Sequence, residues 1–272
     1  MSRKKTNPSL KVLLARYSKS DVIDEIEREY ASVAARNIPL SLIDDNHVVK
    51  KASFPKERIK EMGESLKEKG FFTPLLVRPS GSHYELVLGR KRYLGAKKAE
   101  MEFVPCVIRD ISDEEMLLTL LADARDQREA NVVEMALLFE ALQDKFSYSQ
   151  TTLGEVAHLS RSQVTNILRL LHLPDEVLKE LMVGTLSYGH AKAIASLSDE
   201  EILNMAKRIH EGNLSVRETE YLAREILIHQ DTSPSLEPLK KKYGAASISV
   251  KRKSVTLVFE TEEDKKKFLE GE

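Results

Sequence analysis

Apolar and polar residues follow a helical period over the segment from Leu153 to Ala195. Ser160 or Ser162 stands where a hydroxyl can cap a helix by accepting a backbone N–H. The first part of this segment places its apolar residues on the inner faces of two short helices that meet at a tight turn: Leu153, Ala157, Leu159, Val164, Ile167 and Leu168. This spacing predicts a helix-turn-helix pair.

The polar positions of the second predicted helix hold side chains that can donate to phosphates or read base edges. They are Ser160, Arg161, Ser162, Gln163, Thr165, Asn166 and Arg169. An ordinary helical hairpin with a polar outer face fits the same spacing, so the segment alone leaves both interpretations open. Two positions depart from the usual pattern, because Gly154 stands where alanine is usual and His158 stands where glycine is commonest.

The pattern is different between Ile38 and Asp110, where short strands alternate with short helices. Strands are predicted over 38–43, 73–79, 84–89 and 104–110, and helices over 55–69 and 90–100. Gly70 ends the first helix, and prolines stand at strand edges. This region predicts a compact α/β domain over residues 37–125.

From Asp113 to about Ile228 the helical period dominates and predicts an all-helical domain over residues 126–228. The predicted breaks are Asn131, Ser147 to Ser149, Pro174, Gly184 to Ser187 and Gly212 to Ser215. Residues 229–238 contain two prolines and no periodicity, which predicts a linker.

The two ends of the chain differ from its centre. Residues 1–36 predict a charged tail that contains one helix, over 20–36, with little to bury. Residues 239–272 predict two strands, over 248–252 and 255–260, and a short helix capped by Thr261. This ββα segment is too short for a secure core, so we expect it to pair with a second copy of itself. The fold class is therefore α+β, multidomain and predominantly helical.

Composition limits the classes of function that the chain can have. The 272 residues hold 42 Lys and Arg against 43 Asp and Glu, so affinity for DNA must come from local basic clusters. Such clusters lie at Arg3 to Lys5, Arg90 to Lys98 and Lys240 to Lys253. The single cysteine, Cys106, lies in an apolar run and excludes an internal disulfide or a Cys-based zinc site. No apolar run approaches the roughly twenty residues of a membrane span, which favours a cytoplasmic protein.

Three blocks, in this order, resemble the ParB family of chromosome and plasmid partition proteins and its nucleoid-occlusion (Noc) relatives. The blocks are GFFTPLLVRPSGSHYELVLGRKRYLGAKKAE (70–100), LLADARDQREANVVEMALLFEAL (120–142) and SRSQVTNILRLLHLPDEVLKELMVGTLSYGHAKAI (160–194). The resemblance covers about Ile38 to Glu270. It implies a CTP-binding α/β domain, a helix-turn-helix domain that reads a palindromic site, and a C-terminal dimerisation domain.

The first block places Gly89 between a strand and a helix, where a backbone turn leaves free N–H groups beside a basic run. Such a helix N-terminus suits a polyphosphate. The resemblance implies that CTP contacts Thr73, Arg78, Gly89, Arg90, Lys91 and Arg92. The family box reads GERR, so Arg90 replaces an acidic residue by a cation. The basic run by itself favours the solvent-facing side of an amphipathic helix, and only the order of the three blocks favours a phosphate site.

The second block aligns with the family through Asn131 and Glu134. Where family members have a Glu and an Asn that assist magnesium and hydrolysis, this chain has Asp123 and Ala124. Asp123 is therefore the candidate magnesium ligand and the one candidate catalytic residue, whereas Ala124 supplies no ligand. Any enzymatic activity is at most a weak CTPase. A charged connecting helix is the alternative interpretation.

The third block implies that the helix over 160–171 enters the major groove and that the helices beyond Pro174 support it. Lys192, in the GHA step, is placed to reach a phosphate, and His190 is assigned no chemistry. The resemblance also implies a homodimer that reads a palindromic double-stranded site with paired recognition helices. The resemblance thus implies a nucleoid-associated partition protein that binds a parS-like site and uses CTP and magnesium to close a sliding clamp.

Other functions remain open at this point. A plasmid-type, KorB-like repressor or a Noc-like factor with a degenerate nucleotide site would share the architecture. An enzyme, either a nucleotidase or a nuclease, is an alternative from another class. A dedicated nuclease is disfavoured because no paired-carboxylate or HxxE/HxH cluster holds two metals. A protein-binding adaptor is a further alternative. A ParA-type ATPase is a possible partner, with Arg3, Lys4, Lys5 and Arg16 as contacts. Membrane binding is not expected, because the helix near Asp21 to Tyr30 is acidic.

Overall fold

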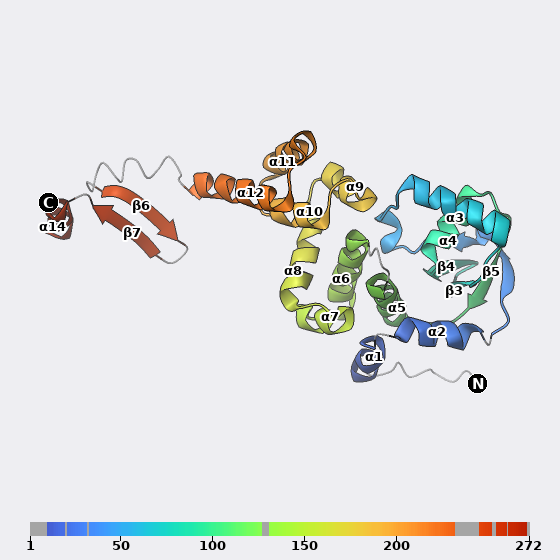
Figure 1. Ribbon diagram of the computed structural model, residues 1–272. Helices are drawn as coiled ribbons and strands as arrows, with labels where there is room; N and C mark the ends of the chain where they lie inside the picture. The colour runs from blue at the N-terminus through green and yellow to red at the C-terminus, as the bar shows by residue number, and fades with distance from the viewer. Residues whose placement is uncertain are drawn as a thin grey trace. The chain divides into compact units, whose positions relative to one another are not determined.

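The computed structural model describes residues 10–19, 21–31, 33–126, 131–231, 245–251, 254–259 and 261–270. They form two compact units, Met1–Ala195 and Ser196–Glu272 (Figure 1). The first unit contains the predicted α/β region and the helix-turn-helix pair.

A five-stranded mixed sheet organises the first unit, in the order β1-β5-β3-β4-β2. The strands are β1 (Arg36–Pro39), β2 (Ile43–Asp44), β3 (Leu75–Ser80), β4 (His83–Leu88) and β5 (Phe103–Ile108). Short 3₁₀ helices cover Leu40–Leu42 and Val49–Lys51. Strand β3 pairs antiparallel with β4 and parallel with β5. Three consecutive β3 residues, Leu75, Leu76 and Val77, are buried, because helices cover both faces of the sheet.

Helices α3 (Lys56–Lys69) and α4 (Arg90–Lys98) contact each other beside one face of the sheet. Gly63 and Gly95 allow this approach, since a Cβ on Gly63 would lie 2.8 Å from the carbonyl oxygen of Gly95. The core of this layer includes Tyr93, Ala96 and the fully buried Cys106. Cys106 is thus a small core residue, as its apolar run in the sequence suggests, and burial raises the pKa of its thiol to about 12.

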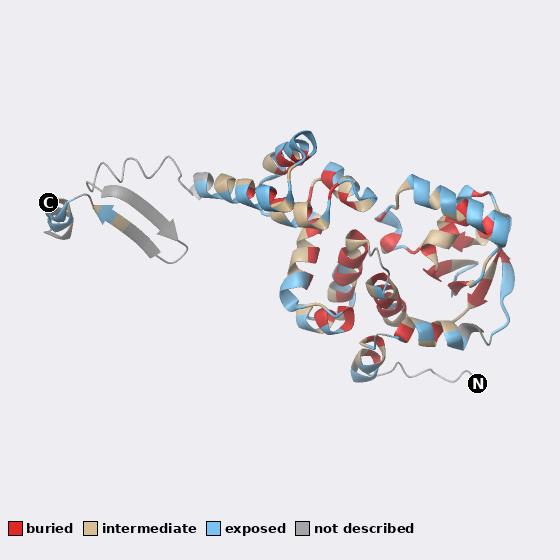
Figure 2. Ribbon diagram, viewed as in Figure 1, coloured by how far each residue is buried: buried red, intermediate tan, exposed pale blue. Residues whose placement is uncertain are grey.

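Helix α5 (Asp113–Asp126) contacts the sheet through β4 and is buried along most of its length (Figure 2). It also contacts α6 (Val132–Phe146) and α7 (Gln150–Ala157). One continuous hydrophobic core therefore runs from Leu76 and Val87 in the sheet, past α5, to Val164 and Ile167 in α8 (Arg161–Arg169). The α/β region and the helix-turn-helix pair share α5 as a common structural support.

The remaining helices confirm the predicted breaks. In the first unit a 3₁₀ turn (Leu170–His172), α9 (Asp175–Val183) and α10 (Tyr188–Ile194) follow α8, and the second unit has α11 (Asp199–Gly212) and α12 (Val216–Asp231). Residues 229–231 belong to α12 rather than to the predicted linker, because the first proline comes only at Pro234. The remaining linker residues, 232–238, lie outside the described residues.

The N-terminal segment is not the predicted tail with one helix and little to bury. Helices α1 (Leu10–Tyr17) and α2 (Val22–Ala31) contact α5, and Leu13, Tyr17, Val22 and Ile26 are at most 3% exposed. The Tyr17 hydroxyl lies 3.1 Å from the Thr119 hydroxyl of α5. These apolar residues form a buried stripe only against a helix about one hundred positions away, which the local pattern does not show.

The predicted contacts for a ParA-type ATPase lie in the same segment. Arg3, Lys4 and Lys5 lie outside the described residues. Arg16 forms an exposed pair with Glu29, at 3.3 Å between Nη2 and Oε2, and its role in partner binding stays a prediction.

The C-terminal segment has the predicted ββα order. Strands β6 (Ala245–Lys251) and β7 (Ser254–Phe259) pair antiparallel and are followed by α14 (Glu262–Glu270). The predicted cap is confirmed, since the backbone N–H of Asp264 donates to the Thr261 hydroxyl at 3.2 Å. Dimerisation through this segment stays a prediction. Across the described ranges, no helix is both long and apolar enough to span a membrane.

Candidate DNA-binding helix and nucleotide cavity

A tight turn at His158 joins α7 to α8. His158 adopts a left-handed conformation with φ of 57°, and the backbone N–H of Leu159 donates to the carbonyl oxygen of Gly154 at 2.9 Å. A Cβ on Gly154 would lie only 2.4 Å from the Leu159 carbonyl oxygen. Glycine at position 154 therefore lets the turn fold back onto α7, which explains the departure from the usual alanine.

A capping box begins α8. The backbone N–H of Gln163 donates to the Ser160 hydroxyl at 3.3 Å, and the backbone N–H of Ser160 donates to Gln163 Oε1 at 2.8 Å. The Thr165 hydroxyl donates to Gln150 Oε1 of α7 at 2.8 Å. These predicted DNA-binding residues thus use polar atoms to fix the helix and its contact with α7.

The other predicted DNA-binding residues lie on the outer side of α8. Arg161 and Ser162 are exposed in its first turn, while Val164 and Ile167 of the same helix are buried. Asn166 and Arg169 are partly exposed, and Lys192 is exposed on α10. This helix therefore presents a polar, partly basic surface opposite an apolar one, as a recognition helix requires.

Replacing Ser160 by alanine is expected to lower the free energy of unfolding by about 1 kcal/mol, because α8 loses the acceptor for the backbone N–H of Gln163. Urea unfolding followed by circular dichroism measures the loss. Ser162→Ala, in the exposed first turn, is the matched control, with an expected change within about 0.5 kcal/mol. Equal losses in the two variants would contradict a capping role specific to Ser160.

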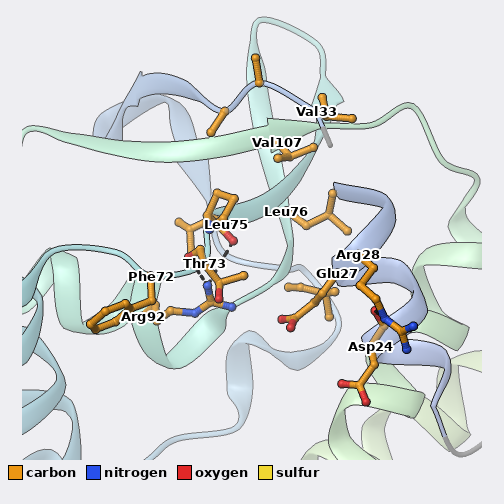
Figure 3. Close-up of a pocket in the computed structure, with 14 residues that line it drawn as sticks. Asp24, Glu27, Arg28, Val33, Phe72, Thr73, Leu75, Leu76, Arg92 and Val107 are labelled. Carbon is orange, nitrogen blue, oxygen red and sulfur yellow. Dashed lines mark hydrogen bonds between the residues drawn. The ribbon is translucent and has the colours of Figure 1, made fainter. Parts of the chain in front are cut away.

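A cavity of about 700 Å³ lies on the side of the sheet that α2 covers (Figure 3). Its volume falls in the range of small-molecule and cofactor sites. Aliphatic side chains form much of its lining, and charged side chains come from α2 and α4. The lining residues are Asp24, Glu27, Arg28, Val33, Ala34, Ala35, Phe72, Thr73, Pro74, Leu75, Leu76, Leu88, Arg92 and Val107.

Arg92 is the basic side chain that α4 contributes to this cavity. Its Nη1 donates to the carbonyl oxygen of Thr73 and, at 3.1 Å, to that of Pro74 (Figure 3). Burial lowers the pKa of Arg92, and the negative charges of Glu27 and Asp123 oppose that shift. Arg92 is therefore a partly buried cation, and the negative charges that act on it come from α2 and α5.

Gly89 allows the start of α4 to approach the cavity. It has φ of +95°, and a Cβ there would lie 2.7 Å from Leu75 Cδ2 and 3.1 Å from Arg92 Nη2. The structure thus brings together three of the residues predicted to bind nucleotide: Thr73, Gly89 and Arg92.

The other predicted nucleotide-binding residues make different contacts. Arg90 pairs with Asp45, at 2.9 Å between Nε and Oδ1, and its guanidinium lies over the Phe54 ring. The Lys91 ammonium also lies over Phe54, at 5.4 Å from the ring centroid. Arg90 and Lys91 are therefore engaged away from the residues that line the cavity.

Arg78, at the far end of β3, belongs to a separate ion-pair network. It pairs with Glu85 at 2.7 Å and with Asp113 at 2.6 Å. Sequence reasoning missed the α2 residues Asp24, Glu27 and Arg28, because nothing in the local pattern places α2 beside β3. It also missed Phe72, which is 88% exposed, since the run GFFTP does not distinguish a core ring from an exposed one.

Asp123 is half-buried on α5, and its negative charge acts on Arg92 and on Glu134. The next residue, Ala124, is buried and offers no ligand atom. No group of three or more His, Cys, Asp or Glu suited to a metal ion occurs within the described part of the chain. Because Mg²⁺ is commonly held by one carboxylate together with substrate phosphates, Asp123 stays a predicted magnesium contact.

Comparison with known proteins identifies the family to which this chain belongs. The family models described as ParB N-terminal domain and ParB HTH domain match residues 24–124 and 128–228. The chromosome-partitioning protein ParB of Caulobacter vibrioides is 37% identical over 213 residues, covering 77% of this chain and 67% of the relative. The chain belongs to the ParB family. The ParB N-terminal match includes the cavity, and the ParB HTH match includes α7 and α8.

Solved ParB structures are also similar. A C-terminally truncated ParB from Caulobacter crescentus, complexed to the centromeric parS site, is 36% identical, covers 70% of this chain and 99% of its own, and has a TM-score of 0.42. The same truncated protein complexed with CTP-γ-S is 34% identical, covers 64% of this chain and 98% of its own, and has a TM-score of 0.32.

Proposed function

We propose that this ParB family member binds a palindromic parS-type DNA site as a homodimer and uses CTP to close a clamp in chromosome or plasmid segregation. One observation supports this most strongly. The capped helix α8, with its polar outer side, shares the α5-centred core with a cavity that holds Thr73 and Arg92. Helix α5 thus supports both the proposed nucleotide site and the proposed DNA-reading helix.

On the DNA, α8 would read base edges through Arg161, Ser162 and Asn166, whose side chains are exposed or partly exposed. Arg169 and Lys192 would contact phosphates. Paired α8 helices of a two-fold dimer then require a two-fold site, with half-sites separated by about one helical turn or a multiple of it.

In the cavity, the phosphates of CTP would lie against Arg92 and the N-terminus of α4 at Gly89, where backbone N–H groups and the helix dipole favour negative charge. Thr73 lies in the same lining. Bound magnesium would offset phosphate charge, with Asp123 as its protein contact. The aliphatic floor around Leu75 and Leu76 would exclude water from the other end of the ligand.

The test is nucleotide binding by the full chain with each of the four ribonucleoside triphosphates, with and without a parS duplex. We expect binding of CTP alone, strengthened by the duplex. Selection of DNA fragments on the purified protein should recover a palindrome, and recovery of no preferred palindrome would overturn the proposal.

A plasmid-type repressor without a nucleotide switch is the second candidate function. It is favoured by Arg90 and Lys91, which are held beside Phe54 and Asp45, and by Ala124, which lacks a ligand atom. Palindrome binding that is unaffected by any nucleotide would select this candidate. Measuring DNA binding with and without each nucleotide therefore distinguishes the two candidate functions.

Asn166→Ala and Lys192→Ala are expected to weaken DNA binding in different ways. Loss of Asn166 should cost about 1–3 kcal/mol on the preferred site and less on a site altered at the contacted base pair. Loss of Lys192 should weaken all sequences similarly and reduce the salt slope by about 1. Equilibrium binding to both duplexes at several salt concentrations measures both effects. Uniform weakening by Asn166→Ala would contradict base reading.

A further inference from the structure

Two acidic residues line a cavity that is proposed to receive a polyanion. Asp24 and Glu27 reach it from α2, together with Arg28, while Arg92 comes from α4 (Figure 3). Figure 3 shows the Glu27 side chain pointing from α2 toward the Arg92 guanidinium. The charge of Glu27 supports the charged state of Arg92. Helix α2 therefore supplies negative charge for a partly buried cation, as nucleotide phosphates would in a bound state.

The link between α1 and α2 is attached to the helix-turn-helix turn. Arg125 of α5 donates from Nη1 to the carbonyl oxygens of Tyr17 at 3.1 Å and Val156 at 2.8 Å, and from Nη2 to that of Lys19 at 2.8 Å. His158 Nε2 donates to the Ser18 carbonyl oxygen at 2.7 Å, since a carbonyl oxygen only accepts. One guanidinium thus joins the α1–α2 link to the end of α7.

We propose that α1 and α2 form a strap that competes with nucleotide phosphates for Arg92 and transmits its displacement from the cavity to the helix-turn-helix turn. The proposal rests on the proposed nucleotide site. Triphosphate charge repels Asp24 and Glu27, so occupancy of the cavity favours a state with α2 displaced. Displacement of α2 pulls on the residues 17–19 that Arg125 and His158 hold. The strap is thus the two-state element that both sites bias.

The first test is the affinity of the full chain for CTP in the presence of a parS duplex. Glu27→Gln is expected to bind CTP about 5-fold or more tighter, with the gain shrinking at high salt, because one repelling charge is removed. Glu25→Gln is the matched control: it removes the same charge from α2, but Glu25 pairs with Lys19 and does not line the cavity. It should leave the affinity unchanged.

The second test is amide hydrogen exchange with and without CTP. Amides of residues 17–19 and 22–31 should lose protection when CTP binds, while those of α3 should not.

The third measurement is the ratio of parS affinities with and without CTP. Arg125→Ala should move that ratio toward 1. Arg16→Ala should not, because it removes the exposed pair with Glu29 and the contact of its guanidinium with the Tyr17 ring but leaves the Arg125 hydrogen bonds in place.

The outcomes separate this inference from the proposed function. If the unmodified chain binds CTP but α2 stays protected, or if the affinity ratio survives Arg125→Ala, the strap is overturned and the nucleotide site stands. If the unmodified chain binds no nucleotide, both are overturned. Tighter CTP binding by Glu27→Gln without loss of protection in α2 would also overturn the strap, since it would mean that the side chain alone moves.

Discussion

Replacing Glu134 by glutamine is expected to raise the free energy of unfolding by about 3 kcal/mol at pH 8, and by less than about 1 kcal/mol at pH 5. Glu134 is 7% exposed near the start of α6. Burial raises the pKa of its carboxyl from the usual 4.5 to about 7; the charges of Arg90 and Lys91 oppose the shift, and those of Asp123 and Asp45 add to it.

The direction follows from the two pKa values. The folded chain holds the Glu134 proton more tightly than the unfolded chain, so its contribution to stability is full below about pH 4.5. That contribution is lost as the pH rises through about 7, where the folded protein must keep a buried carboxylate. Glutamine has nearly the same shape and no charge, so the variant escapes this loss.

Urea unfolding of both proteins at intervals from pH 5 to pH 8 measures the effect. Glu140→Gln is the matched control, because Glu140 lies on the same helix and is exposed. It should show no pH-dependent difference from the unmodified protein. A Glu134→Gln difference that is constant over the whole pH range would mean that Glu134 titrates normally in the folded state.

Replacing Gly154 by alanine is expected to lower the free energy of unfolding by about 2–3 kcal/mol. The new Cβ would lie 2.4 Å from the Leu159 carbonyl oxygen, which is backbone and has no rotamer to adopt. The turn must therefore move away from α7. Since α8 follows this turn directly, we also expect weaker binding to the preferred DNA site.

Thermal or urea unfolding together with DNA binding tests this expectation. Glu155→Ala, at the exposed neighbouring position of α7, should change stability by no more than about 0.5 kcal/mol and leave DNA binding intact. A Gly154→Ala protein as stable as Glu155→Ala would show that the α7–α8 approach tolerates an extra methyl group.

The basic box shows how far the sequence predicts the site. The sequence predicts Gly89 to Arg92 together as phosphate contacts, because a glycine and three cations stand at the N-terminus of a predicted helix. In the structure Arg92 turns toward Thr73 and Pro74, whereas Arg90 and Lys91 turn toward Phe54. Successive helical residues leave the helix axis about 100° apart, and the contacts of each long side chain then decide where its charge lies, so the run of cations does not by itself show which of them reaches the cavity.

Local sequence patterns predicted the helix-turn-helix pair, a serine cap for its second helix and the ββα order of the C-terminal segment. Each depends on residues a few positions apart, whose spacing and hydrogen bonding act within one or two turns of chain. The packing of α1 and α2 on α5, and the meeting of Glu27 and Arg92 at one cavity, became apparent only from the three-dimensional arrangement of the elements. These contacts join residues far apart in sequence, and their free energy comes from burial and charge between elements rather than from the pattern within any one of them.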